Sequence, residues 1–175
     1  MQKKTIWDLN RPTTEEFRRS EKNPLVLVLD NIRSLNNIGS MFRTSDAFAV
    51  KCICLCGITA CPPSPEIHKT ALGAEDSVEW KYYDDTLDAI SELKGEGYTI
   101  CCLEQVKESV SLENFDVDRE KKYAIIVGHE VEGVSQAVVD ASDVCIEIPQ
   151  MGMKHSLNVS VSTGVALWQF FKHFL

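Results

Sequence analysis

Short, unbroken apolar runs recur along the chain, and segments with helical spacing of apolar residues separate them. The first run covers residues 24–30 and ends at polar Asp30; helical periodicity follows over 38–50, and a second run covers 52–56. A short apolar run without alternation is typical of a strand that is buried on both faces. Such strands, alternating with helices, predict an α/β domain with a mostly parallel sheet.

The rest of the chain repeats this pattern. We expect further strands at 78–83, 98–103, 123–127 and 144–148, and further helices at 66–72, 84–94, 134–141 and 157–175. Near the start, Thr13 and Glu16 have the spacing of a capping box and predict a short helix. We therefore divide the chain into an N-terminal arm or short helix, 1–22, and one domain, 23–175.

Composition limits the class of protein. The chain has 175 residues, of which 44% are apolar, enough for one domain with a full core. No apolar run reaches the ~20 residues that span a bilayer, and the N-terminus lacks an apolar signal core. We therefore expect a cytoplasmic protein.

Charge and cysteine content narrow the class further. The formal net charge of −8 argues against bulk attraction to nucleic acid, but basic residues gather near the start: Lys3, Lys4, Arg11, Arg18, Arg19 and Lys22. Several of the seven cysteines fall within apolar runs, as small buried residues in a reducing compartment do. Cys52, Cys54 and Cys56 alternate and should share one strand face. Their spacing lacks the partners of a usual zinc site.

Three polar loops follow predicted strands, at 31–43, 128–133 and 149–158. Ligands of open parallel sheets bind beyond the carboxyl ends of the strands, so we expect these loops to form one crevice. In the first loop, an Asn at the strand-to-helix connection and Arg43 on the next helix are both placed to face it. Taken alone, these two residues are explained better by a capped helix with a surface arginine than by a function.

The third loop is the most unusual. Pro149 and Gly152 force a turn, and Ser156 is placed to cap the helix that follows. Asn158, Ser160 and Ser162 then fall in the first turns of that helix, where Ala or Leu would be better helix formers. A poor local choice inside a consistent element indicates a functional site.

Three motifs stand in order in these loops. The first is Asn-x-Gly-x-x-x-Arg-Thr from Asn37. The second is Gly-x-Glu-x-x-Gly from Gly128, which is not a dinucleotide fingerprint. The third is Ile-Pro-x-x-Gly-x-x-x-Ser-Leu-Asn-Val-Ser from Ile148. Together they resemble the motifs of the SpoU (TrmH) branch of the SPOUT RNA methyltransferases, over about residues 24–175.

The resemblance implies an RNA ribose 2′-O-methyltransferase that uses S-adenosylmethionine, needs no metal and acts as a homodimer. It also implies the SPOUT fold, with helices on both sheet faces and a C-terminal trefoil knot. Carried onto this chain, the cofactor is held by Gly128, Ile148 and Leu157, with an apolar contact near Leu103. The catalytic set it implies is Asn37, Arg43, Glu130, Ser156 and Asn158.

The chain departs from the family at Gln150, where Met is usual, and at 162–164, where small alanines are usual. The Ile-Pro-Gln form, with Glu104 and Gln105 upstream, looks most like the tRNA guanosine methyltransferases that act in the D-loop. The alternatives are a ribosomal RNA methyltransferase, a non-catalytic RNA-binding relative and an unrelated α/β nucleotide-binding enzyme. The absence of P-loop and Rossmann fingerprints counts against the last.

Arg43 is the group expected to activate the ribose hydroxyl. A guanidinium does not readily lose its proton, so a role as literal base is unfavourable. Bidentate contact with the neighbouring phosphate and stabilisation of the developing alkoxide are the alternative. Asn37 and Ser156 would then orient Arg43 or the ribose, and Glu130 would fix the loop backbone.

Overall fold

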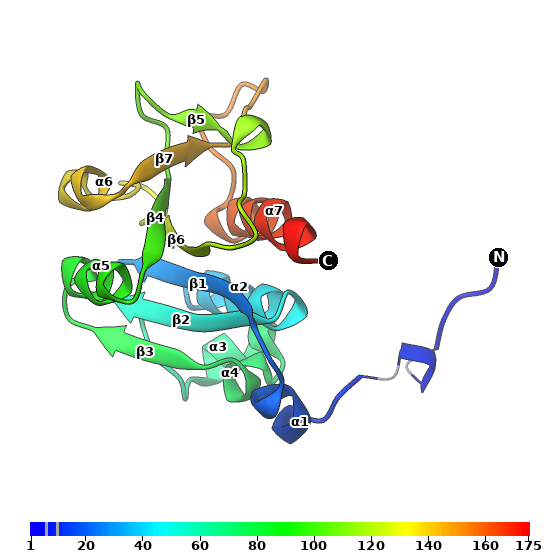
Figure 1. The fold of residues 1–175 in the computed structure, drawn as a ribbon. Helices are drawn as coiled ribbons and strands as arrows, with labels where there is room; N and C mark the ends of the chain where they lie inside the picture. The colour runs from blue at the N-terminus through cyan, green and yellow to red at the C-terminus, as the bar shows by residue number, and fades with distance from the viewer. Residues whose placement is uncertain (6, 10) are drawn as a thin grey trace.

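The computed structural model describes residues 1–5, 7–9 and 11–175. Its centre is a seven-stranded sheet in the order β3-β2-β1-β6-β4-β7-β5 (Figure 1). Every pairing between neighbouring strands is parallel, which confirms the predicted sheet. The strands are β1 Asn23–Asp30, β2 Val50–Cys56, β3 Trp80–Tyr83, β4 Tyr98–Leu103, β5 Val110–Ser111, β6 Lys122–Val127 and β7 Val144–Glu147.

Helices cover both faces of the sheet. One core joins it to α2 (Leu35–Ala47), α3 (Pro65–Ala71), α4 (Ala74–Ser77) and α7 (Val159–Phe171). The other joins it to α5 (Thr86–Gly95) and α6 (Gln136–Ala141). In β1, Leu25, Leu27 and Leu29 enter the first core, whereas Val26 and Val28 enter the second. The apolar run of β1 is therefore unbroken because both of its faces are buried.

Two helices begin at other residues than predicted, and each difference changes the element in which a predicted site residue lies. Helix α2 begins at Leu35, because the Ser34 hydroxyl accepts from the Asn37 amide at 3.3 Å. Asn37 therefore lies in the first turn of α2 rather than in the preceding loop. Helix α7 begins at Val159, and the Asn158 side chain accepts from the Ser160 and Val161 amides at 2.9 and 3.3 Å. The prediction that Ser156 caps this helix was wrong.

Several short elements were not predicted. They are α4, β5 and the 3-10 helices Trp7–Leu9, Leu112–Asn114 and Lys172–Phe174, the last of which replaces the end of the predicted C-terminal helix. Each is too short for hydrophobic periodicity to reveal it. The remaining predicted strands and helices are present, with ends that differ by a few residues.

The capping box near the start is confirmed. The Thr13 hydroxyl accepts from the Glu16 amide and the Glu16 carboxylate accepts from the Thr13 amide, at the start of α1 (Thr14–Arg19). The described parts of the segment before α1 project away from the sheet (Figure 1). Residues 6 and 10 of the predicted arm lie outside the described residues. No helix in the described ranges is long and apolar enough to cross a membrane.

The alternating cysteines of β2 share one face, as predicted. Cys54 and Cys56 are buried in the core beneath α5 and α6, and Cys52 packs against it. Burial raises the pKa of the Cys56 thiol to about 12, which keeps it protonated at neutral pH. Among the described residues, no three His, Cys, Asp or Glu side chains are grouped so as to hold a metal ion.

Candidate functional site

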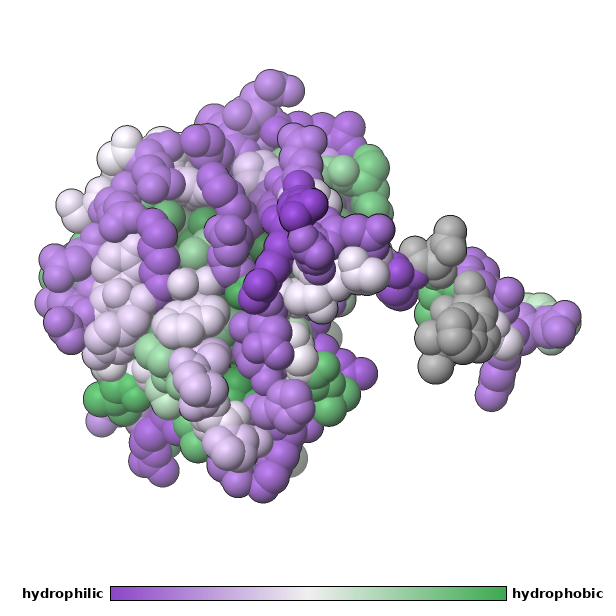
Figure 2. Space-filling view, turned by 90° about the horizontal axis from the view of Figure 1, so that it is seen from below, coloured by the Kyte–Doolittle hydropathy of each residue, from purple (hydrophilic) through white to green (hydrophobic). Residues whose placement is uncertain are grey.

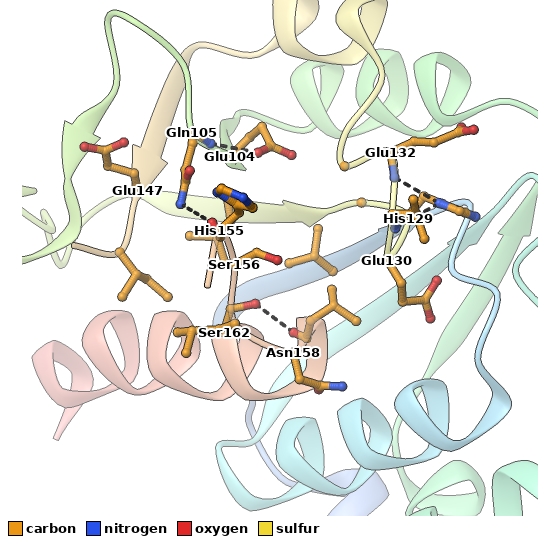
Figure 3. A pocket seen from close by; sticks show the side chains of 18 of the residues that line it. Glu104, Gln105, His129, Glu130, Glu132, Glu147, His155, Ser156, Asn158 and Ser162 are labelled. Atoms are coloured by element: carbon orange, nitrogen blue, oxygen red, sulfur yellow. Dashed lines mark hydrogen bonds between the residues drawn. The ribbon is translucent and has the colours of Figure 1, made fainter. Parts of the chain in front are cut away.

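A cavity of about 530 Å³ opens at the carboxyl edge of β4, β6 and β7 (Figure 3). Its walls come from four segments, 103–105, 127–133, 146–150 and 155–162. The first three follow the ends of neighbouring parallel strands, and the last leads into α7. This volume lies in the range that encloses a cofactor-sized ligand.

A chain of hydrogen bonds joins the three polar loops at one side of the cavity. The Glu130 carboxylate accepts from the backbone amides of Arg33 at 3.0 Å and Ser34 at 2.9 Å. It also accepts from the Asn37 side-chain amide at 3.0 Å. The Asn37 carbonyl oxygen in turn accepts from the Asn158 side-chain amide at 3.2 Å. Three of the five predicted catalytic residues are thus connected directly.

The protonation state of Glu130 follows from these contacts. Burial raises the pKa of its carboxyl, but hydrogen bonds from the Arg33 amide, the Asn37 side chain and the Ser34 amide lower it more. The net result is a pKa below the ordinary value of 4.5. Glu130 is therefore an anion at neutral pH and acts as an acceptor for all three donors.

The 128–133 loop is closely packed and requires its glycines. A Cβ on Gly128 would lie 2.3 Å from the Val134 nitrogen, so a larger residue would displace backbone. Gly133 has a φ of 71°, in the left-handed region, and a Cβ there would meet the Glu104 carboxylate at 2.3 Å. That carboxylate accepts from the Val134 amide at 2.9 Å and so fixes the end of the loop.

The imidazole of His129 holds the centre of the same loop. Its Nδ1 accepts from the amides of Val131 and Glu132, both at 3.2 Å. Nδ1 therefore carries no proton in this arrangement. The side chain supports the loop backbone rather than presenting a free base to the cavity at that nitrogen.

One contact ties the 149–158 loop to the end of β4. The Gln105 side-chain amide donates to the His155 carbonyl oxygen at 3.2 Å. In Figure 3, His155 and Ser156 lie across the cavity from His129 and Glu130. Ser156 lines the cavity, is exposed, and hydrogen-bonds to none of the residues that the structure describes.

The cavity walls contain most of the predicted site residues. All four expected cofactor contacts line it: Leu103, Gly128, Ile148 and Leu157. Glu130, Ser156 and Asn158 line it as well, and Asn37 lies behind them through its hydrogen bonds. Arg43 is not among the lining residues; it is exposed and lies about 9 Å further along the α2 axis than Asn37. The structure therefore leaves Arg43 outside the crevice that it was expected to face.

Charge makes the cavity selective. Its lining contains four glutamates, Glu104, Glu130, Glu132 and Glu147, and none of its lining residues is Lys or Arg. Such a site suits a ligand that carries positive charge and disfavours one that carries phosphates. The apolar side chains of Leu103, Ile146 and Ile148 provide a surface for a flat, weakly polar ring.

Residue-by-residue reasoning missed three supporting side chains, namely Glu104, Gln105 and His129. Glu104 and Gln105 had entered only as marks of a sub-family, and His129 only as an unspecified motif position. The available signal was their position, because each lies within two residues of the carboxyl end of a buried strand, at the edge where ligands bind.

Comparison with known proteins places the chain among RNA methylases. The model of the SpoU rRNA Methylase family matches residues 24–168. A tRNA (guanosine(18)-2′-O)-methyltransferase from Aquifex aeolicus is 31% identical over 157 residues, which is 88% of this chain and 72% of that protein. The 23S rRNA (guanosine-2′-O-)-methyltransferase RlmB from Nitrosomonas europaea is 32% identical over 165 residues, 91% of this chain and 61% of that protein.

Solved structures agree with the sequence comparison. A crystal structure of an AdoMet-bound rRNA methyltransferase from Sinorhizobium meliloti superposes with a TM-score of 0.82 at 25% identity. The match covers 91% of this chain and 60% of that one. The chain thus spans less than two thirds of the length of this protein and of the Nitrosomonas relative.

The Glu130 contacts predict a pH-dependent contribution to stability. Because the folded-state pKa is lowered, the contribution is present above about 4.5 and is lost as pH falls through the folded-state value. Glu130→Gln, which has one acceptor oxygen for three donors, should cost about 1–3 kcal/mol at pH 7 and less at pH 3. Urea unfolding at several pH values measures both quantities.

Glu132→Gln is the matched control, because it removes the same charge from an exposed position in the same loop. It should change stability by less than about 0.5 kcal/mol at either pH. Equal losses in the two variants would mean that Glu130 acts only through the net charge of the loop.

Proposed function

The chain belongs to the SpoU rRNA Methylase family, and we propose that it transfers a methyl group from S-adenosylmethionine to a ribose 2′-oxygen of RNA. The observation that carries the proposal is the Glu130–Asn37–Asn158 chain of hydrogen bonds, which joins the three motif loops beside a cavity with no Lys or Arg among its lining residues. The Aquifex and Nitrosomonas relatives are named guanosine 2′-O-methyltransferases, which supports the ribose as acceptor.

The cavity fits S-adenosylmethionine in size, shape and charge. Leu103, Ile148 and Leu157 would hold the adenosine part, and the backbone at Gly128 would approach it closely because no side chain intervenes. The four lining glutamates favour a ligand with a positive sulfonium and an ammonium group. When bound, the cofactor supplies the methyl group as an electrophile and needs no metal to activate it.

The residues proposed to face the RNA are Arg43, which lies outside the cavity, and Ser156 and Asn158, which line it. Arg43 is exposed and forms no ion pair within the described part of the chain, so its guanidinium is available for the phosphate beside the target ribose. We assign it the stabilisation of the developing alkoxide rather than removal of the proton, since a guanidinium does not readily lose its proton. Asn158 and Ser156 would orient the ribose. The hydrogen bond between Glu130 and Asn37 would fix the relative positions of the loops that carry these residues.

We propose folded tRNA as the substrate, with a guanosine of the D-loop as target and ribosomal RNA as the alternative. The Ile-Pro-Gln form of the third motif supports this choice. The basic residues of the 1–22 arm would contact phosphates, and 23–175 would form the methyltransferase domain. All seven cysteines are free thiols, which suits action in the cytoplasm.

The C-terminal segment is the proposed site of the trefoil knot. Strand β7 lies between β4 and β5 in the sheet, and the 148–158 segment then returns to α7, which packs against the core beneath β6. The Gln105–His155 contact would hold the returning segment against the loop after β4. This arrangement supports the knot that the resemblance implies.

A homodimer is proposed from the surface of α7. Val161, Val165 and Trp168 lie on one helix face and are 54%, 42% and 50% exposed. The opposite face, with Ala166, Leu167 and Phe170, is buried in the core. An exposed apolar stripe of this kind indicates an interface, and a twofold partner would cover it together with α2.

The first test of function is transfer of radiolabelled methyl groups to purified tRNA and, separately, to ribosomal RNA. We expect wild-type protein to label tRNA in alkali-resistant dinucleotides, the sign of ribose methylation. Arg43→Ala should lower the rate ~10²–10³-fold, because one group that stabilises charge is removed. Arg43→Lys should restore little, since a point charge lacks the planar fork.

Calorimetry with S-adenosylhomocysteine, the demethylated product, provides the control. Its affinity should be equal in wild type and Arg43→Ala, because Arg43 lies outside the cavity. Labelling of ribosomal RNA alone would refute the tRNA assignment and leave the reaction standing. Cofactor binding without transfer to either RNA would identify a non-catalytic relative.

The dimer is tested by a double substitution on the exposed stripe, Val161→Lys/Val165→Lys. Two charges in an apolar interface should weaken the dimer at least about tenfold, a cost of ~1.4 kcal/mol or more. Sedimentation velocity at micromolar concentration measures this. Ile58→Lys, at an apolar position 61% exposed and away from α7, should leave the dimer intact. A wild-type protein that sediments only as monomer contradicts the proposal.

A further inference from the structure

A second hollow, of about 370 Å³, lies at the opposite edge of the sheet. Its lining comes from the end of α1 and from the amino ends of β1, β2, β4 and β6, and includes Arg18, Lys22, Pro24, Lys51, Tyr98 and Lys122. An eight-residue strand separates the two edges by about 25 Å. The hollow is therefore distinct from the methyl-transfer cavity, and Figure 2 views the molecule from the side of α1, where hydrophilic residues cover much of the surface.

Charge in this hollow is opposite to that of the protein as a whole. Four basic side chains, Arg18, Lys22, Lys51 and Lys122, line it with two carboxylates, Glu21 and Glu79. The chain as a whole carries a formal net charge of −8, whereas basic side chains outnumber carboxylates in this hollow. None of the four cations forms an ion pair with any residue that the structure describes.

Two of these cations converge on one aromatic ring. The Nζ atoms of Lys51 and Lys122 lie 5.9 and 5.5 Å from the centroid of the Tyr98 ring, and Lys122 also donates to the Glu96 carbonyl oxygen at 3.1 Å. Tyr98 as a whole residue is 4% exposed. Two like charges beside one buried tyrosine form a site that an anion would stabilise.

Lys22, the third lysine of the hollow, is held in place by contacts within the 1–22 arm. Lys22 donates to the Ser20 carbonyl and hydroxyl oxygens at 2.9 and 3.0 Å, and its Nζ lies 4.2 Å from the Phe17 ring centroid. These contacts fix its ammonium group beside the strand ends. The capped helix α1 thus completes one side of the hollow.

We propose that this hollow binds a phosphate group of the RNA backbone, at a distance from the nucleotide that is methylated. The inference rests on the proposed function, because that function supplies the RNA. A backbone phosphate is favoured over a free nucleotide, since none of the lining residues is a glycine that would let backbone amides cradle a di- or triphosphate. An RNA that reaches both edges must extend over about 25 Å, a distance that a folded RNA covers.

The test compares two charge-matched double variants in binding folded tRNA without cofactor, over a range of salt concentrations. Lys51→Gln/Lys122→Gln removes both lysines beside Tyr98. Lys81→Gln/Lys94→Gln removes two exposed lysines that pair with Glu92 and Asp143. The first variant should lower the slope of log affinity against log salt by about 0.7–0.9, from one lost phosphate contact, and the second should leave it unchanged.

Three outcomes would overturn the proposal. An unchanged slope in Lys51→Gln/Lys122→Gln excludes the phosphate contact. Equal decreases of the slope in both variants would mean that the lysines act only through the net charge of the protein. Binding of ATP that is lost in this variant, with an unchanged RNA slope, assigns the hollow to a free nucleotide.

The readout is independent of methyl transfer. Affinity for S-adenosylhomocysteine and the melting temperature should stay at wild-type values in both double variants, which excludes damage to the cavity or the fold. A wild-type protein that shows the predicted RNA slopes but transfers no methyl group would refute the proposed function and leave this site standing.

Discussion

The Glu130 carboxylate accepts three N–H groups from the segment that leads into α2, and the geometry of the site depends on this contact. It joins the end of β6 to the end of β1, and Asn37 extends the connection to Asn158 at the start of α7. One ionised side chain thereby holds three loops that are far apart in sequence. A neutral or shorter residue would leave these donors, two of which are partly buried, without an acceptor, so the loops would separate at a measurable cost in stability.

The parallel sheet determines at which edge the polar loops and the two sites lie. All strands are parallel, so their carboxyl ends gather the polar loops at one edge and their amino ends meet at the other. The carboxyl edge carries glutamates around a cavity, and the amino edge carries lysines around a buried tyrosine ring. This separation gives one acidic protein a site suited to a cationic cofactor and another suited to a phosphate.

Much of this follows from the sequence, because the strands are buried on both faces and therefore appear as unbroken apolar runs. The residues that line the cavity also stand in ordered motifs after those strands. Helix starts were harder to predict: Ser34 and Asn158 cap their helices through hydrogen bonds that periodicity does not encode. The exposed place of Arg43, the support by Glu104 and His129, and the lysines beside Tyr98 depend on packing between distant segments.

A double-mutant cycle tests the coupling of the loops most directly. Calorimetry would give the affinity for S-adenosylhomocysteine in wild type, Glu130→Gln, Asn158→Ala and the double variant. If the chain through Asn37 acts as one unit, the second substitution should cost less than it does in wild type, with a coupling of about 0.5–3 kcal/mol. Losses that add to within ~0.5 kcal/mol would show that the two residues act independently and would contradict this account.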